Sequence, residues 1–282
     1  MKAAPLIVHT AGAYQGPSSA TLLEIEARVA ALESFDRLLR DRSEAVRRED
    51  GIHYAEILPG LEVWRALYDR GSGFPPDLQG ALGSILDRTQ MLDDSDLAAT
   101  PPIAQTGLWP SAGRFVCDEL DWLAFRRDTL VDCGVTPETF CKQVATIFPS
   151  LVLSSEFPKC LETLEGGFEM FLPVVVRALT ALETRLLPTL GNLPIVDGLK
   201  QFTAASGFST TMEGSAERNE ALTFAFGSDQ SQRRLVCAPH MKLDTSPMSG
   251  DTRHYYNRIY FNPHQDDPDT VRIHVGHVGC HL

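Results

Sequence analysis

Histidine is unevenly distributed along this chain of 282 residues. Six of its eight histidines fall near the carboxyl end, and only His9 and His53 lie elsewhere. The imidazole is the side chain best suited to proton transfer near neutral pH, and it is a common metal ligand. The carboxyl-terminal histidines are therefore the first candidates for chemistry: His240, His254, His264, His274, His277 and His281.

Alternation of apolar and polar residues predicts strands at 221–226, 233–243, 258–262 and 271–276. Because successive side chains on a strand point to opposite faces, each of the last three strands has an apolar face and a polar face. If the apolar faces pack against helices, the polar faces combine into a single wetted surface. We expect that surface to carry His240, Lys242, Arg258, Tyr260, Arg272 and His274.

This combination of side chains suits a phosphodiester substrate. The cations would bind phosphate, and these are Lys242, Arg258 and Arg272. The imidazoles and the phenol would transfer protons, and these are His240, His274 and Tyr260. For RNA, a base can deprotonate the 2′-hydroxyl while a cation stabilises the phosphorane oxygens, so neither a metal ion nor another cofactor is required.

An ordinary solvated surface is the alternative interpretation of these strands. One face of an antiparallel sheet is commonly polar and exposed. Arg234 and Arg272 are therefore explained equally well as ordinary solvated surface residues and as functional residues. His254 and His264 lie in polar segments and are expected to be exposed loop residues.

A metal site is a second alternative. His277 and His281 are four residues apart, a spacing that suits metal ligation on a helix, but Gly276 and Gly279 disfavour a helix here. Gly276 also breaks the alternation, so His277 falls on the apolar face unless a bulge shifts it. Without an HxH or HExxH core, histidines bonded to backbone carbonyls are the preferred interpretation, and no metal is predicted.

Two further motifs receive structural interpretations. Cys237 and His240 are three residues apart on one strand and therefore point to opposite faces, which places Cys237 in the core rather than in a Cys–His dyad. The acidic stretch 93–96 lacks the glycine and the distal glutamate of an EF-hand, so a helix cap or a solvated loop is expected there.

The elements that position these residues follow from periodicity and capping. Thr21 and Glu24 form a capping-box pattern at the start of a helix predicted over 21–48. The other predicted helices span 61–70, 77–88, 114–133, 137–148, 168–187 and 194–205. Residues 93–113 are assigned to a loop or linker, and a short strand is allowed near the amino end. The expected fold class is α+β, with a mostly helical region at 1–205 followed by an antiparallel sheet at 206–282.

Composition bounds the class of protein. With 25 basic and 37 acidic residues, the chain carries a net charge of −12, which disfavours non-specific binding to nucleic acid or to anionic membranes. The acidic excess is concentrated in the first 200 residues, so a local cationic face remains feasible near the carboxyl end. Six cysteines without a CxxC pair are typical of reduced thiols, and no segment is apolar enough to span a membrane, which together predict a cytoplasmic protein.

The carboxyl-terminal strands resemble a known family. The RIYF strand at 258–261 and the later V-x-I-x-V strand that leads to His277 look like the central sheet of RelE/ParE-type bacterial toxins, which are small endoribonucleases or gyrase poisons. Arg258 and Tyr260 match best and His277 matches loosely, whereas His240 and Lys242 have no secure counterpart. Those toxins are short basic chains, whereas this chain is acidic and carries a long preceding region.

Two functional hypotheses follow. The resemblance implies a metal-independent endoribonuclease of toxin or phage-defence type, acting on an RNA substrate, whose helical region binds a protein partner or antitoxin. The alternative hypothesis is a non-catalytic interaction subunit of a bacterial defence or regulatory complex, in which the carboxyl-terminal sheet is structural.

Overall fold

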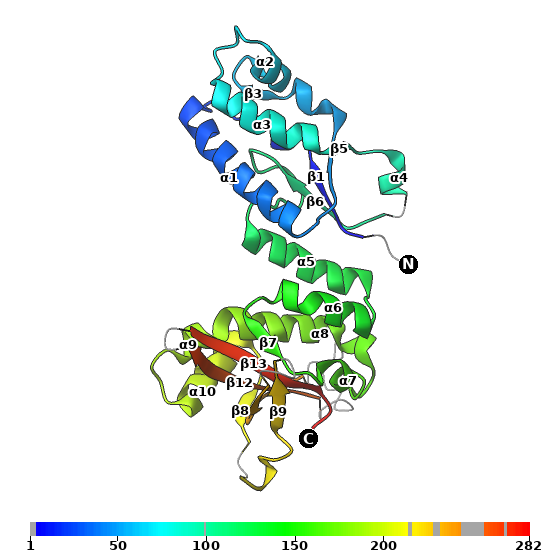
Figure 1. Ribbon diagram of the computed structural model, residues 1–282, viewed down its shortest axis with the longest axis vertical. Helices are drawn as coiled ribbons and strands as arrows, with labels where there is room; N and C mark the ends of the chain where they lie inside the picture. The colour runs from blue at the N-terminus through cyan, green and yellow to red at the C-terminus, as the bar shows by residue number, and fades with distance from the viewer. Residues whose placement is uncertain (1–3, 99, 214–215, 228–231, 244–256, 268–269) are drawn as a thin grey trace. The chain divides into compact units, whose positions relative to one another are not determined.

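The computed structural model describes residues 4–98, 100–213, 216–227, 232–243, 257–267 and 270–282 (Figure 1). The chain divides into two compact units, Met1–Cys133 and Gly134–Leu282. The predicted division lies after residue 205, whereas the second unit begins at residue 134, because helices at 157–161 and 195–206 contact the strands at 270–279 and 210–212. Among the described residues, no helix has the length and apolar character needed to cross a bilayer.

A parallel sheet forms the centre of the first unit. Its strand order is β5 (Gln90–Met91), β2 (Val46–Arg48), β1 (Leu6–His9) and β6 (Ile103–Thr106). The expectation that the sheet lies only at the carboxyl end is therefore wrong, whereas the α+β mixture itself is confirmed: both units contain helices and strands. These strands have two to four residues, and β1 is buried throughout, so they lack the alternation that reveals a half-exposed strand.

Helix α1 (Leu22–Asp41) covers part of this sheet. The predicted capping box is present, because Thr21 accepts from the Glu24 backbone and Glu24 accepts from the Thr21 backbone. The helix buries the predicted apolar stripe of Ile25, Val29, Leu32, Phe35 and Leu39. It ends earlier than expected because residues 46–48 form β2. The other elements of this unit are α2 (Val63–Tyr68), α3 (Pro76–Arg88), α4 (Asp94–Leu97), α5 (Glu119–Cys133), β3 (Glu56–Leu58) and β4 (Leu61–Glu62).

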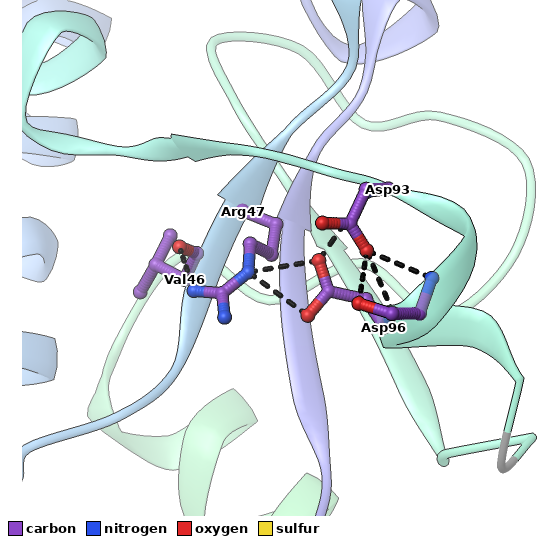
Figure 2. A network of polar contacts seen from close by, with 5 residues as sticks. Val46, Arg47, Asp93 and Asp96 are labelled. Carbon is purple, nitrogen blue, oxygen red and sulfur yellow. Dashed lines mark hydrogen bonds and ion pairs between the residues drawn. The ribbon is translucent and has the colours of Figure 1, made fainter.

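The predicted linker at 93–113 contains α4 and β6, and Figure 2 shows how α4 is held. Asp93 caps this helix by accepting from the backbone N–H groups of Ser95 and Asp96, so the predicted helix cap is confirmed. The Arg47 Nε atom on β2 donates to both carboxylate oxygens of Asp96 at 3.1 and 2.9 Å. Capping and ion pairing together fix this one-turn helix beside the sheet.

The second unit begins with helices. These are α6 (Pro137–Ile147), α7 (Phe157–Leu161), α8 (Phe168–Ala181), α9 (Leu187–Leu190) and α10 (Ile195–Ser206). A π-helical segment, Leu182–Leu186, joins α8 to α9. The start of α6 matches the prediction, since Thr136 caps the helix and Pro137 occupies its first position.

A five-stranded sheet completes the second unit. Its order is β7 (Leu151–Leu153), β13 (Thr270–Gly279), β12 (Arg258–Asp267), β11 (Pro239–Lys242) and β8 (Thr210–Met212). The pairing is antiparallel except between β13 and β7, which corrects the prediction of a purely antiparallel sheet. Figure 1 shows α6 and α8 on one side of the β12–β13 hairpin and β9 (Thr223–Phe226) on the other.

The predicted strand 233–243 is in fact two strands. Residues Arg233–Val236 form β10, which pairs with β9 (Thr223–Phe226) in a two-stranded ribbon, whereas β11 belongs to the large sheet. The break falls at Cys237 and Ala238. Alternation continues across this break, so the pattern alone cannot show that the chain changes partners.

Candidate functional site on the carboxyl-terminal sheet

Strand register brings the predicted site residues to one face of the large sheet. His240 lies opposite Tyr260, and Lys242 lies opposite Arg258. On the other side of β12, His274 lies opposite Asn262, and Arg272 lies opposite His264. Because directly opposed residues of antiparallel strands project to the same side, all six predicted residues share that face.

A bulge at Gly276 adds His277 to this face. Tyr260 lies opposite His277 while the next residue of β12, Phe261, lies opposite Val275, so Gly276 is an extra residue on β13. A Cβ atom at Gly276 would approach the Phe224 ring to 2.3 Å, which explains why glycine occupies the bulge. The alternation pattern placed His277 on the apolar face unless a bulge shifted it. The bulge is present, so His277 lies on the polar face of the sheet.

The shared face is covered rather than wetted, contrary to expectation. Tyr260 is fully buried, and only 7% of His240, 4% of Arg258 and 3% of His274 is exposed. The β9–β10 ribbon covers the face: Phe224 stacks on His277 and Phe226 meets His274 edge-on. The Asn262 side-chain amide donates to the Val236 carbonyl at 2.8 Å and ties the ribbon to the sheet.

The ribbon divides the face into two groups, of which the first surrounds Tyr260. We define the Tyr260 cluster as the residues whose rings or charges adjoin that phenol: Tyr260, His240, His277, His281, Arg258, Arg218 and Glu213. Ring centroids of His240, His277 and His281 lie 5.3, 5.9 and 6.4 Å from that of Tyr260. The cluster reaches solvent at its edge, since Thr211 is exposed and His281 is partly exposed.

Hydrogen bonds orient the imidazoles of the Tyr260 cluster. His240 Nε2 lies 3.1 Å from the Thr211 hydroxyl, and His277 Nε2 lies 2.9 Å from the Cys280 carbonyl. His277 therefore behaves as predicted for a histidine bonded to a backbone carbonyl. Arg218 pairs with Glu213 at 3.2 Å and also donates to the main-chain oxygen of Leu282.

Burial sets the protonation states in the cluster. It lowers the pKa of His240 below its ordinary value, and the nearby Arg258 guanidinium lowers it further. The pKa of His281 is lowered by burial and then by the charges of Arg218 and Arg258. Burial raises the pKa of Tyr260. The imidazoles are therefore neutral proton acceptors at neutral pH, beside a protonated phenol.

The second group lies beyond Phe226 and contains two of the predicted residues. His274 Nε2 is 3.5 Å from Asp266 Oδ1, and its ring meets that of His264 at a centroid distance of 5.7 Å. Burial lowers the pKa of His274, and the neighbouring Asp266 carboxylate opposes that effect. Arg272 is exposed near the same place. His240 and His274 thus share a face but belong to different groups.

The remaining predicted residues have distinct positions. Lys242 is partly exposed opposite Arg258. Cys237 is fully buried as predicted, and burial raises the pKa of its thiol to about 12, which leaves it a poor nucleophile. His254 lies outside the described residues.

None of the described histidines belongs to a group of side chains close enough to share a metal ion. In the part of the chain that the structure describes, the group of ligand atoms close enough to share a cation is Cys117, Asp118 and Asp121 in the first unit. The sulfur there adjoins Asp121 at 3.4 Å, and burial followed by that hydrogen bond raises the pKa of the thiol to about 11, which disfavours the thiolate needed for metal binding.

Several site residues were not singled out from the sequence. Arg218 and Glu213 lie in a segment without apolar–polar alternation. They are recognised only from the structure, in which Arg218 donates to Leu282 and the charges of both residues lie near Tyr260. In the first unit, His9 Nδ1 lies 2.9 Å from the Tyr14 hydroxyl, and both side chains are buried. The sequence does place His9 at the end of the apolar segment that forms β1. Because functional residues of parallel sheets commonly lie at the carboxyl ends of the strands, His9 could have been noticed on that ground.

Comparison of the chain with protein-family models, with curated proteins and with solved structures finds no match.

Proposed function

We propose that the second unit is a metal-independent endoribonuclease of toxin or phage-defence type, with the Tyr260 cluster as its centre. One observation carries the proposal: a protonated phenol lies among three imidazoles, beside the guanidinium groups of Arg258 and Arg218. Cleavage of RNA needs a base, an acid and a cation at one place, and the cluster supplies all three.

The reaction assigns one role to each kind of side chain. A neutral imidazole, His240 or His281, accepts the proton of the 2′-hydroxyl, and the resulting oxygen bonds to phosphorus. The bond from phosphorus to the 5′-oxygen breaks, and Tyr260 donates the proton that this leaving oxygen requires. Arg258 and Arg218 stabilise the charge on the phosphorane oxygens. The products are a 2′,3′-cyclic phosphate and a 5′-hydroxyl.

Access is from the edge where His281 and Thr211 reach solvent. Arg218 donates there to the main-chain oxygen of Leu282. A substrate phosphate would replace this oxygen as the acceptor of the guanidinium, since phosphate pairs with arginine in a bidentate manner. Lys242, next to Arg258 across the strands, would contact a flanking phosphate.

The burial of Tyr260 and Arg258 favours the second candidate, a non-catalytic interaction subunit. Polar side chains inside a core often specify a unique packing without any part in chemistry. In that case the cluster would be a structural network, and the helices of either unit would supply the partner-binding surface.

Incubation of the purified full chain with end-labelled RNA in excess EDTA separates the two candidates. The endoribonuclease should release fragments that end in cyclic phosphate. Tyr260→Phe, which keeps the ring and removes the acid, should lower the cleavage rate about 10²-fold or more. Arg234→Ala is the matched control, since Arg234 is an exposed cation of β10 and not a member of the cluster. Intact RNA with wild-type protein would support the interaction subunit instead.

A further inference from the structure

A cleft of about 340 Å³ opens on the same sheet face, on the far side of Phe226 from Tyr260. Its apolar lining is Phe226 and Val152, and its polar lining includes Arg233, Asp266, Arg272 and His274. Along β12 the row that contains His274 is two residues from the row that contains Tyr260, a separation of about 7 Å.

The charges of the cleft cancel. Two cations, Arg233 and Arg272, and two carboxylates, Asp266 and Asp267, line the same space. A bare anion such as phosphate gains little from such a lining, because each positive charge is matched by a negative one. A planar ligand with hydrogen-bond donors on one edge and an anionic group elsewhere complements it better.

Asp266 lines the cleft and has a carboxylate oxygen that is open to a ligand. Its Oδ1 atom accepts from Arg233 at 2.7 Å and lies 3.5 Å from His274 Nε2. Its Oδ2 atom makes no hydrogen bond to any residue that the structure describes. Arg233 donates to Oδ1 of this carboxylate, so Oδ2 is the oxygen that remains open to a ligand.

Arg272 supplies the second half of a binding site. It is exposed, it lines the cleft, and within the described part of the chain its guanidinium has no ion pair. A phosphate at the mouth of the cleft would pair with this cation while the ring of the ligand occupies the cleft.

We infer that the cleft binds a guanine base of RNA, with a neighbouring phosphate on Arg272; the choice of ligand rests on the proposed function. The carboxylate of Asp266 can only accept hydrogen bonds, and it has two sites left for them: Oδ2, and the second lone pair of Oδ1 beside the bond from Arg233. On the Watson–Crick edge of a base, guanine alone presents two adjacent donors, N1–H and the exocyclic amino group. Adenine and cytosine each pair a donor with an acceptor, and uracil flanks its single donor with two carbonyls.

Titration of the full chain with 5′-nucleotides by isothermal calorimetry tests this inference without any cleavage step. We expect 5′-GMP to bind saturably and at least about tenfold more tightly than 5′-AMP, 5′-CMP or 5′-UMP. Asp266→Asn should remove this preference, whereas Arg272→Ala should weaken 5′-GMP but leave guanosine unchanged. Arg234→Ala, the exposed neighbour of Arg233 on the opposite face of β10, is the control and should bind as wild type.

Equal affinity for the four nucleotides would overturn the inference, as would equal affinity for 5′-GMP and inorganic phosphate. Binding of 5′-GMP that survives Asp266→Asn unchanged would place the ligand elsewhere and would also overturn it. The outcome is separable from the proposed activity, since Tyr260→Phe should lower the cleavage rate about 10²-fold or more without changing 5′-GMP affinity. If the chain binds 5′-GMP but does not cleave RNA, the guanine site is supported and the proposed nuclease activity is contradicted.

Discussion

Tyr260 and His277 are cross-strand partners with ring centroids 5.9 Å apart, and their pairing depends on the extra residue Gly276. Without this bulge, the parity of β13 would turn His277 to the opposite side of the sheet. The bulge also makes room for Phe224, which stacks on His277 and closes the ribbon over the face. One glycine thus controls both the composition of the Tyr260 cluster and its burial.

Gly276→Ala should destabilise the second unit. The added Cβ would lie 2.3 Å from the Phe224 ring, and overpacking of this kind costs about 1–3 kcal/mol of unfolding free energy. Urea unfolding followed by far-UV circular dichroism measures the loss. All three tryptophans, Trp64, Trp109 and Trp122, lie in the first unit, so their fluorescence follows the unfolding of that unit separately.

Gly80→Ala is the matched control for that substitution. Gly80 lies within α3, where an added Cβ meets nothing within 4 Å, so alanine should stabilise the first unit by up to about 1 kcal/mol. Equal unfolding of Gly276→Ala and wild type would show that Phe224 moves aside freely.

The stability of the first unit should fall as the pH is lowered from about 6.5 to 4. Burial, assisted by the charge of Arg48, lowers the pKa of His9 to about 4, whereas the unfolded chain titrates at about 6.5. Between these values the unfolded state binds more protons, so the free energy of unfolding rises with pH. The full effect is bounded by roughly 3 kcal/mol.

Tryptophan fluorescence during urea unfolding at pH 4.5, 5.5 and 7 measures this slope in the first unit. His9→Gln removes the titrating group and should flatten the profile. Tyr14→Phe removes only the hydroxyl that lies 2.9 Å from His9, so it should keep the slope. A steep profile in His9→Gln would assign the pH dependence to other groups.

Cleavage of RNA should be flat over a wide range around pH 8. The base must be neutral, and burial moves the pKa of His240 and His281 below about 6.5, so activity falls only at acidic pH. The acid must stay protonated, and burial moves the pKa of Tyr260 above about 10. The pH profile of kcat/KM checks this, and an acidic limb centred above pH 7 contradicts the assignment of a buried imidazole as base.

Arg47→Ala should loosen α4 and destabilise the first unit by about 1.5–3 kcal/mol, the range for hydrogen bonds to charged groups. Its side chain is 24% exposed and that of Asp96 is 15% exposed, so solvent screens the pair only in part. Arg65→Ala is the control, because Arg65 and Asp69 are both well exposed and 3.9 Å apart, which predicts a change below about 0.5 kcal/mol. Equal losses for the two variants would show that the contact in Figure 2 adds nothing beyond a surface pair.

The sequence by itself determined the local structure. Three features could be predicted because they depend only on residues that are close together in the sequence. They are the capping box at Thr21, the apolar stripe of α1 and the Thr136–Pro137 start of α6. The alternation of β12 and of β13 up to Gly276 likewise showed which side chains share a face, because parity is a property of a single strand. The burial of Cys237 followed from the same rule.

Only the tertiary structure decided how these elements meet. The parallel sheet of the first unit joins strands of two to four residues, too short for a periodic signal. The split between β10 and β11 and the burial of Tyr260 under Phe224 depend on contacts between residues distant in the sequence. The local sequence pattern shows which side chains lie on each face of a helix or strand. Packing across the whole unit decides which surface covers those side chains. In this protein it covers the face that was expected to be open, which leaves the enclosed Tyr260 cluster and the neighbouring cleft.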